Sequence, residues 1–362
     1  MRSLFKTILF VFTGFIFPLL SLAQDFQWAK TMGSGSIDAA LSVKTDPAGN
    51  VYSTGVFSDS ADFDPGPGVF KLTSAGAEDV FISRLDASGN FMWAKAIGGM
   101  FSDYGTSLAI DISGNIYITG HFLGTVDFDP GLGTFNLTSV GSINTFVCKL
   151  DAQGNFVWAK SMGGSFQNSA NAISLDAGGN IYLAGSFFET VDFDPGAGIF
   201  NLTSVGGQDI YISKLDASGN FKWAKAMGGP SDDFPVSIAP DPSGNILTTG
   251  AFNETADFDP GSGVFSLTSK GAEDIFISNI DSSGQFVWAK SMGSESFDEG
   301  QAITTDASGN VFVTGFFSFT VDFDPGTGVF NLSTPGDKHD YDIYILKLNN
   351  SGTFSWAKSI YA

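Results

Sequence analysis

The string Asp-Phe-Asp-Pro-Gly occurs five times in the 362-residue chain, and successive copies are 65 residues apart. A strict period of this length indicates one supersecondary unit stacked repeatedly, because such a unit cannot bury its apolar side alone. The copies begin at Asp62, Asp127, Asp192, Asp257 and Asp322.

A second marker, Trp-Ala-Lys, follows the same period. The first four intervals between its copies are 65 residues and the last is 68. The three extra residues fall in the polar run Asp337-Lys338-His339-Asp340 of the fifth unit. The copies begin at Trp28, Trp93, Trp158, Trp223, Trp288 and Trp356.

Each unit is predicted to contain four short strands. In the second unit we expect them at Ser107–Asp111, Ile116–Phe122, Thr145–Leu150 and Phe156–Met162. Gly-Asn pairs separate the first strand from the second and the third from the fourth, as tight hairpin turns require. We refer to the four strands of a unit as A, B, C and D.

The D strand indicates how neighbouring units pack. Alternation places Phe91, Trp93 and Ile97 on one face and mostly small residues on the other, so we expect the aromatic residues in the core. Four-stranded antiparallel units without any helical pattern predict an all-β fold, a five-bladed β-propeller.

The terminal strands pose a counting problem, because there are six D strands for five blades. Closing the ring with a terminal strand would remove open sheet edges. Both Phe26–Met32 and Phe354–Tyr361 could serve as the outer strand of the last blade. We expect the terminal strands to close the ring; an incomplete ring is the open alternative.

Two segments carry a resemblance to a known family. Gly98–Gly120, with Ser102-Asp103-Tyr104-Gly105 and Gly114-Asn115-Ile116-Tyr117, resembles the SBBP-type β-propeller repeat, as does Asp209–Asn220. The resemblance covers essentially residues 26–361 and implies an exported bacterial protein without a shared catalytic activity. The acidic Asp-Phe-Asp-Pro-Gly variant is similar to exported proteins of Bacteroidetes-like bacteria.

The N-terminus has the pattern of a signal peptide. Arg2 and Lys6 precede an apolar run, and Ser21-Leu22-Ala23 resembles a cleavage site. We therefore expect cleavage after Ala23, a secreted or cell-surface product, and one β-propeller domain over residues 24–362. The apolar run is too short for a convincing membrane span.

Composition limits the partners. The formal charge is −21 and becomes −23 without the leader, which carries two cations and no acids. This excess argues against nucleic acid and anionic lipid surfaces. Cys148 is the only cysteine, so no internal disulfide can form. We also expect the protein to be a monomer and not to insert into a membrane.

The paired aspartates of the repeated string are a candidate Ca²⁺ site. In an extended strand the two carboxylates would point to the same side, about 6.8 Å apart. They supply at most four oxygens, whereas calcium takes about six to eight. The alternative is that the first Asp accepts backbone N–H bonds and Asp-Pro-Gly forms a tight turn. The candidate ligands are Asp62, Asp64, Asp127, Asp129, Asp192, Asp194, Asp257, Asp259, Asp322 and Asp324.

Antiparallel strands place the B–C inserts and the D–A loops at one end of the molecule. The D–A loops carry polar residues 65 apart, and we expect these to form a binding face. They are Asp38, Asp103, Asn168, Asp233 and Asp298.

A catalytic centre is not apparent. His121 and His339 are each unique to one unit, and neither has a motif-spaced nucleophile or a second histidine. Cys148 takes the place of serines in other units and is interpreted as a packing residue.

Three functions remain open. The first is a secreted, non-catalytic binding module that presents an acidic loop face to a glycan or protein, with Ca²⁺ as a candidate cofactor. The second is a polysaccharide-active hydrolase or lyase, which predicts one deep pocket near His121 or His339. The third is a structural spacer of a cell-surface array.

Overall fold

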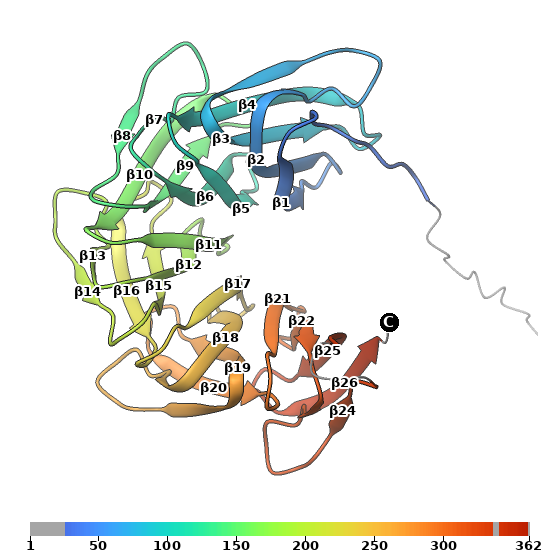
Figure 1. Cartoon of the computed structure of the whole chain (residues 1–362), viewed down its shortest axis with the longest axis vertical. Helices are drawn as coiled ribbons and strands as arrows, with labels where there is room; N and C mark the ends of the chain where they lie inside the picture. Colours follow the sequence, from blue (N-terminus) through green and yellow to red (C-terminus); the bar gives the residue numbers. More distant parts are fainter. Residues whose placement is uncertain (1–25, 336–339, 361–362) are drawn as a thin grey trace, which may run out of the picture.

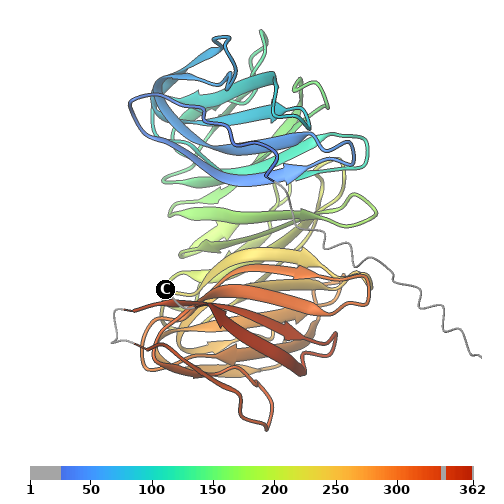
Figure 2. The ribbon, with the colours of Figure 1, turned by 90° about the vertical axis from the view of Figure 1, so that its right-hand side faces the viewer.

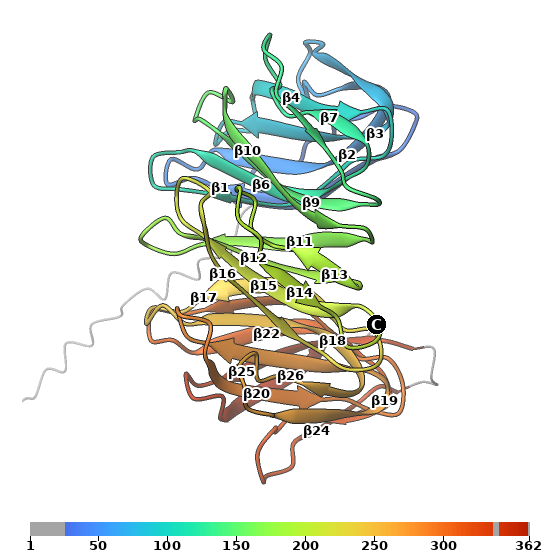
Figure 3. The ribbon, with the colours of Figure 1, turned by 90° about the vertical axis from the view of Figure 1, so that its left-hand side faces the viewer.

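The computed structural model describes residues 26–335 and 340–360 as an open arc of five antiparallel units (Figure 1). The predicted signal peptide and His339 lie outside the described residues. Figures 2 and 3 show the strands running side by side across the depth of the molecule, with their connections at two opposite ends. Within the described ranges, no helix is long and apolar enough to cross a membrane.

Each unit has four antiparallel strands in the order A-B-C-D, which confirms the prediction. Unit 1 comprises β1 (Asp38–Thr45), β2 (Val51–Asp62), β3 (Lys71–Leu85) and β4 (Phe91–Gly99). Unit 2 comprises β5 (Tyr104–Ile110), β6 (Ile116–Phe122), β9 (Asn144–Leu150) and β10 (Phe156–Gly164). Unit 3 comprises β11 (Asn168–Leu175), β12 (Ile181–Phe187), β15 (Asp209–Leu215) and β16 (Phe221–Met227). Unit 4 comprises β17 (Phe234–Pro240), β18 (Ile246–Asp257), β19 (Ser266–Ile280) and β20 (Phe286–Met292), and unit 5 comprises β21 (Glu299–Thr305), β22 (Val311–Phe317), β25 (Asp342–Leu348) and β26 (Phe354–Ile360).

The inserts between strands B and C form their own short strands. In units 1 and 4 they continue the long B and C strands, and in the other units they form separate hairpins. The insert of unit 2 pairs with the end of β4, where Gly98 lies opposite Asp127, so it ties unit 2 to unit 1. The separate strands are β7 (Thr125–Asp127), β8 (Asn136–Thr138), β13 (Thr190–Asp192), β14 (Asn201–Thr203), β23 (Thr320–Asp322) and β24 (Asn331–Ser333).

The innermost strands β1, β5, β11, β17 and β21 follow one another around the centre of the arc (Figure 1). Each contains a β-bulge that breaks the register with strand B. The bulge turns Thr106 toward unit 3, where its hydroxyl donates to the carbonyl of Ala170 at 2.7 Å. Hydrogen bonds of this kind fix the inner strands of consecutive units against each other.

Apolar side chains of consecutive units share one core at each contact, which we call a junction. At the first junction, Val80 and Ile97 of unit 1 pack with Leu108 of unit 2. One detail of the sequence prediction is wrong: Phe91 and Trp93 do not share a face. A bulge between strands C and D places Phe91 in a different apolar cluster from Trp93.

A tryptophan on strand D completes each junction. Trp93 lies over Gly154 in the C–D turn of unit 2, and Gly154 has φ = 77°. A Cβ at that glycine would be 3.3 Å from the indole ring. The same contact joins Trp158 to Gly219 and Trp288 to Gly352, so the Trp-Ala-Lys repeat is explained by junction packing.

The ring is not closed, and the prediction that the terminal strands close it is wrong for this structure. Strand β26 pairs with β25 in unit 5, whereas Trp28 lies on Gly89 of unit 1 and Gly33 pairs with Asp62. The N-terminal segment therefore occupies the place of a preceding unit's D strand. The two ends are separated by a gap (Figure 1), and the structure does not establish a closed five-bladed propeller.

The end faces show what closure would have buried. Val43 of unit 1 is 61% exposed, whereas its equivalents in the other units are 0 to 7% exposed: Leu108, Ile173, Ile238 and Ile303. Ile343 of unit 5 is 51% exposed, whereas Val80, Ile210 and Ile275 are 0% exposed. The arc thus ends in two uncovered halves of a junction.

The contact between tryptophan and glycine predicts a graded effect of substitution. Gly154→Ala forces an unfavourable φ and displaces Trp93, so we expect a loss of about 2–3 kcal/mol in the free energy of unfolding. Gly244→Ala is the control, because Gly244 has φ = 87° and no heavy atom within 4 Å of its Cβ position. It should cost only about 1 kcal/mol. Equal losses in chemical denaturation would contradict the role given to Trp93.

Candidate functional site

The B–C inserts and the D–A loops lie at the same end of the strands, as expected. Asp103 in the D–A loop accepts a hydrogen bond from the backbone N–H of Leu123, which follows strand B, at 3.2 Å. The other end carries the A–B and C–D turns, where Arg84 contacts Asp46 at 3.8 Å and the carbonyl of Ala152 at 2.9 Å. We call the first end the insert end and the second the hairpin end.

The two aspartates of each insert hold the turn of their own loop. Oδ1 of Asp192 accepts hydrogen bonds from the N–H groups of Asp194 at 3.0 Å and Phe200 at 2.8 Å. Oδ1 of Asp194 accepts one from Gly196 at 2.8 Å. These contacts match the alternative in which the aspartates accept backbone hydrogen bonds and Asp-Pro-Gly forms a turn.

The same bonds recur in all five inserts. The first aspartate caps two backbone N–H groups and the second caps the glycine: Asp62 and Asp64, Asp127 and Asp129, Asp257 and Asp259, Asp322 and Asp324. In the part of the chain that the structure describes, no three His, Cys, Asp or Glu side chains gather in a way that could hold a metal ion. The candidate Ca²⁺ ligands therefore do not form a shell by themselves.

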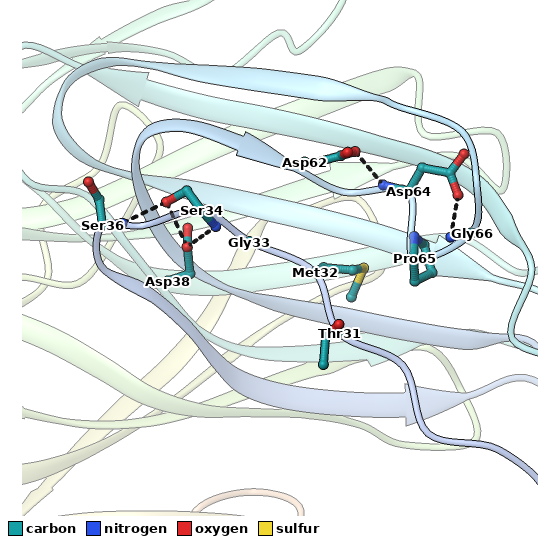
Figure 4. A pocket seen from close by; sticks show the side chains of 10 residues that line it. All are labelled: Thr31, Met32, Gly33, Ser34, Ser36, Asp38, Asp62, Asp64, Pro65 and Gly66. Atoms are coloured by element: carbon teal, nitrogen blue, oxygen red, sulfur yellow. Dashed lines mark hydrogen bonds between the residues drawn. The ribbon is translucent and has the colours of Figure 1, made fainter.

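One polar pocket of about 600 Å³ lies beside the insert of unit 1 (Figure 4). Its lining includes Asp38, Asp62 and Asp64, and the figure shows Asp38 turned toward Ser34, away from the insert pair. Oδ2 of Asp38 accepts hydrogen bonds from the N–H of Ser34 at 2.5 Å and from its hydroxyl at 2.8 Å. Its carboxylate thus stabilises the loop between the N-terminal segment and β1.

The D–A residues expected to form a binding face are mostly buried. Asp103, Asp233 and Asp298 are fully buried, Asn168 is nearly so, and Asp38 is half-buried. Asp233 accepts hydrogen bonds from the N–H groups of Gly229 at 2.9 Å and Asn253 at 3.1 Å. The four buried side chains hold the loops together from inside and are not placed to contact a ligand directly.

A second row of buried acids was missed in the sequence. At the start of strand C, Asp79 lies against Gly98, and the next residue, Gly99, donates its N–H to Asp103 at 2.8 Å. Two carboxylates from consecutive units thus flank one Gly-Gly backbone. The junction pairs are Asp79 with Asp103, Asn144 with Asn168, Asp209 with Asp233, and Asp274 with Asp298. Their common 65-residue spacing was the available signal.

Burial raises the pKa of these carboxyl groups. It raises the pKa of Asp79 to about 6 and that of Asp103 to about 7, where the charge of Asp79 adds to the effect of burial. The pKa of Asp209 rises to about 6 and that of Asp233 to about 7 for the same reasons. Oδ1 of Asp79 and of Asp209 has no hydrogen-bond partner, so the charged form is poorly stabilised.

The histidine and the cysteine have structural surroundings. His121 is stacked on Tyr104 with ring centroids 4.9 Å apart, and burial lowers its pKa to about 4. It is therefore neutral at pH 7. Cys148 is completely buried, and burial raises the pKa of its thiol well above the usual value. Neither group has the surroundings of an activated acid, base or nucleophile.

The tips of the inserts carry exposed aliphatic side chains that the sequence analysis did not single out. Beneath each tip a phenylalanine packs on strand D; Phe200 and Phe221 have ring centroids 4.9 Å apart. This contact and the aspartate caps hold the tip away from the core. The exposed residues are Val69, Leu132, Ile199, Val264 and Val329.

The junction pairs predict a pH dependence of stability. Because the folded-state pKa values are raised, the protein binds more protons folded than unfolded between about pH 4 and 7, and stability falls as pH rises through this range. Asp209→Asn with Asp233→Asn copies the Asn144–Asn168 junction and should recover about 1 kcal/mol or more at pH 8, but little at pH 4.

The reciprocal variant is the control. Asn144→Asp with Asn168→Asp should lower the free energy of unfolding at pH 8 and steepen its fall between pH 5 and 8. Urea denaturation at both pH values measures the two effects. Equal slopes in both variants and in the native protein would contradict the assignment.

Substitution of an insert aspartate can distinguish a role in stabilising the turn from a role in binding Ca²⁺. Asp192→Ala leaves two N–H groups without their acceptor and should cost about 1–2 kcal/mol, whereas Asp192→Asn keeps Oδ1 and should cost little. Millimolar CaCl₂ should not raise the melting temperature of the native protein. A calcium-dependent rise that Asp192→Asn reduces would instead establish the metal.

Comparison with known proteins agrees with the repeat. The family model of the SBBP β-propeller repeat matches residues 93–121. An uncharacterized WD repeat-containing protein of Acanthamoeba polyphaga mimivirus is 27% identical over 201 residues, which cover 49% of this chain and 14% of that protein. The regulatory protein FlaEY of Caulobacter vibrioides is 26% identical over 145 residues, 40% of this chain and 15% of that protein.

The solved structures that match this chain are more distant in sequence. A protein of unknown function from Bacteroides caccae covers 89% of this chain, which in turn covers 81% of it, with 10% identity and a TM-score of 0.41. The WD40 domain of Neurospora crassa Pan2 reaches a TM-score of 0.35 at 10% identity, with 86% of each chain covered. Both TM-scores lie below 0.5. Residues 93–121 thus match the SBBP β-propeller repeat, and this segment lies in a chain whose described residues form four-stranded antiparallel units.

Proposed function

We propose that the chain is an exported, non-catalytic module that binds protein partners through its five insert tips. The observation that carries this proposal is an exposed aliphatic side chain on each of the five insert loops, four at the same position of the repeat and Leu132 two residues earlier in unit 2. Several weak equivalent sites bind a multivalent partner more tightly than one site alone. Export is inferred from residues 1–23 only.

The construction of the tips favours binding without rearrangement. In each insert, aspartate caps fix the backbone and a phenylalanine rests on strand D, as Phe265 does on Phe286 with ring centroids 4.8 Å apart. A loop that is already ordered loses little conformational entropy when it binds. The exposed aliphatic residue is then free to enter a partner's apolar pocket.

The chemistry of the tips favours protein over glycan. Sugar rings are commonly bound on open aromatic faces, but the insert phenylalanines are already engaged with strand D. Aliphatic side chains beside carboxylates suit a partner surface with apolar pockets and basic residues. The formal charge, −21 for the whole chain and −23 without the leader, would speed the approach of such a partner.

The relatives support an interaction role in general terms. One of them carries WD repeats by name, and the chain spans only 14% and 15% of the two relatives it matches. The described structure adds no paired acid and base that would favour the hydrolase alternative.

The proposal predicts a strong effect of changing all tips together. Replacing Val69, Leu132, Ile199, Val264 and Val329 with serine should reduce binding to arrayed cell-surface proteins about 100-fold, through lost avidity. A single Ile199→Ser change should reduce it only a few-fold. Surface plasmon resonance at matched surface densities measures both effects.

A matched control changes aliphatic residues elsewhere. Ile112 lies fully exposed in an A–B turn at the hairpin end, and Val157 and Val287 are exposed on strand D. Serine at these three positions should leave binding unchanged. Binding to a glycan array alone, or equal loss in control and tip variants, would contradict the proposal.

A further inference from the structure

A cavity of about 580 Å³ lies on unit 5, where no further unit covers the sheet. Its lining is dominated by three aromatic side chains and two carboxylates. Phe297 comes from the loop before β21, Phe316 from β22, and Tyr341 precedes β25. The remaining lining residues are Glu273, Asp342 and Ile343.

The aromatic rings form a corner. Phe316 and Tyr341 have ring centroids 5.2 Å apart, and their planes meet at 82°. Glu273 and Phe297 are held side by side by a bridge between their backbones, which brings the third ring to the cavity. Phe297 and Tyr341 remain exposed, so the site is open to a ligand.

The carboxylate of Glu273 lacks the hydroxyl partner of its equivalent in unit 1, whereas Asp342, like Asp79, Asp209 and Asp274, has one oxygen without a hydrogen-bond partner. Asp342 is 4% exposed, and its Oδ2 has no hydrogen-bond partner. Glu273 is half-buried; in unit 1 the equivalent Glu78 accepts a hydrogen bond from the hydroxyl of Ser102, whose place is taken by Phe297. No cation is among the residues that line the cavity.

The combination is specific to this end of the chain. At the position of Phe316 the other units carry Val56, His121, Ser186 and Ala251, and at the position of Tyr341 they carry Glu78, Ile143, Gln208 and Glu273. A structural role in the repeat therefore does not account for these two aromatic residues. The departure from the repeat points to a separate function.

We propose that this cavity binds an alkylated ammonium group, such as a quaternary ammonium or a methylated lysine side chain. Aromatic faces attract such cations, and their methyl groups favour apolar walls. The unpaired oxygen of Asp342 and the carboxylate of Glu273 would offset the positive charge. The site lies apart from the insert tips and does not depend on their function.

Other ligand classes fit less well. An anion would meet two carboxylates and no cation. A neutral apolar ligand would gain no electrostatic attraction from the two carboxylates. A sugar would prefer a flat aromatic platform, whereas the two rings here stand at 82° to each other.

Calorimetric titration of the full chain tests the proposal with choline and its uncharged carbon analogue, 3,3-dimethylbutan-1-ol. At constant ionic strength, choline should bind about tenfold or more tightly than the alcohol, because only the cation gains from the rings and carboxylates. A peptide with trimethyllysine and its unmodified form make up the second arm. Preference for the peptide over choline assigns the site to a protein tail, and the reverse assigns it to a small molecule.

The variants use residues that occur at the equivalent positions of other units, so we expect them to fold. Phe316→Ala reproduces Ala251 and should weaken choline binding about fivefold or more. Asp342→Asn reproduces Asn144 and should also weaken it, while leaving binding of the alcohol unchanged. Glu78 is the equivalent of Glu273 in unit 1 and lies outside the cavity, so Glu78→Gln serves as the matched control for Glu273→Gln. Glu78→Gln should leave choline binding within about twofold of the native value.

Three results would overturn the proposal. The first is equal binding of choline and the alcohol. The second is binding of methyl glucoside without binding of any ammonium ligand. The third is unchanged choline affinity in both Phe316→Ala and Asp342→Asn.

Discussion

The structure depends on the burial of one unit's apolar face under the inner strand of the next. Leu108, Ile173, Ile238 and Ile303 each enter a core that the preceding unit cannot complete alone. The tryptophan and glycine contact, the inner-strand hydrogen bonds and the carboxyl pairs all lie at this same contact. Stability is therefore a property of neighbouring units taken together, as in other repeat proteins.

The strands and hairpin turns of each unit could be predicted from the sequence because the same pattern occurs in all five units. The hairpin turns follow from their glycines: Gly114 has φ = 82°, and Asp111 accepts hydrogen bonds from Ser113 and Asn115. Ring closure could not be predicted, because it depends on the angle between units and no local pattern encodes that angle. The placement of Phe91 failed because alternation does not reveal a bulge.

The candidate site shows the opposite limit. Repeated aspartates suggested a ligand-binding face, but Asp103 and Asp233 are buried and bind backbone N–H groups. Conversely, Phe316 and Tyr341 matter because they are not repeated. In a chain of near-identical copies, a shared residue is first explained by the packing that all copies share, and a departure from the repeat is the better guide to a ligand.

The Asn144–Asn168 junction has a consequence for how the arc responds when the pH rises to neutral values. Deprotonation places like charges inside the other three junctions but leaves this one neutral. The junction between units 2 and 3 then keeps its stability, while the other three junctions lose part of theirs. One pair of amide side chains thus makes the junction between units 2 and 3 less sensitive to pH than the other three junctions.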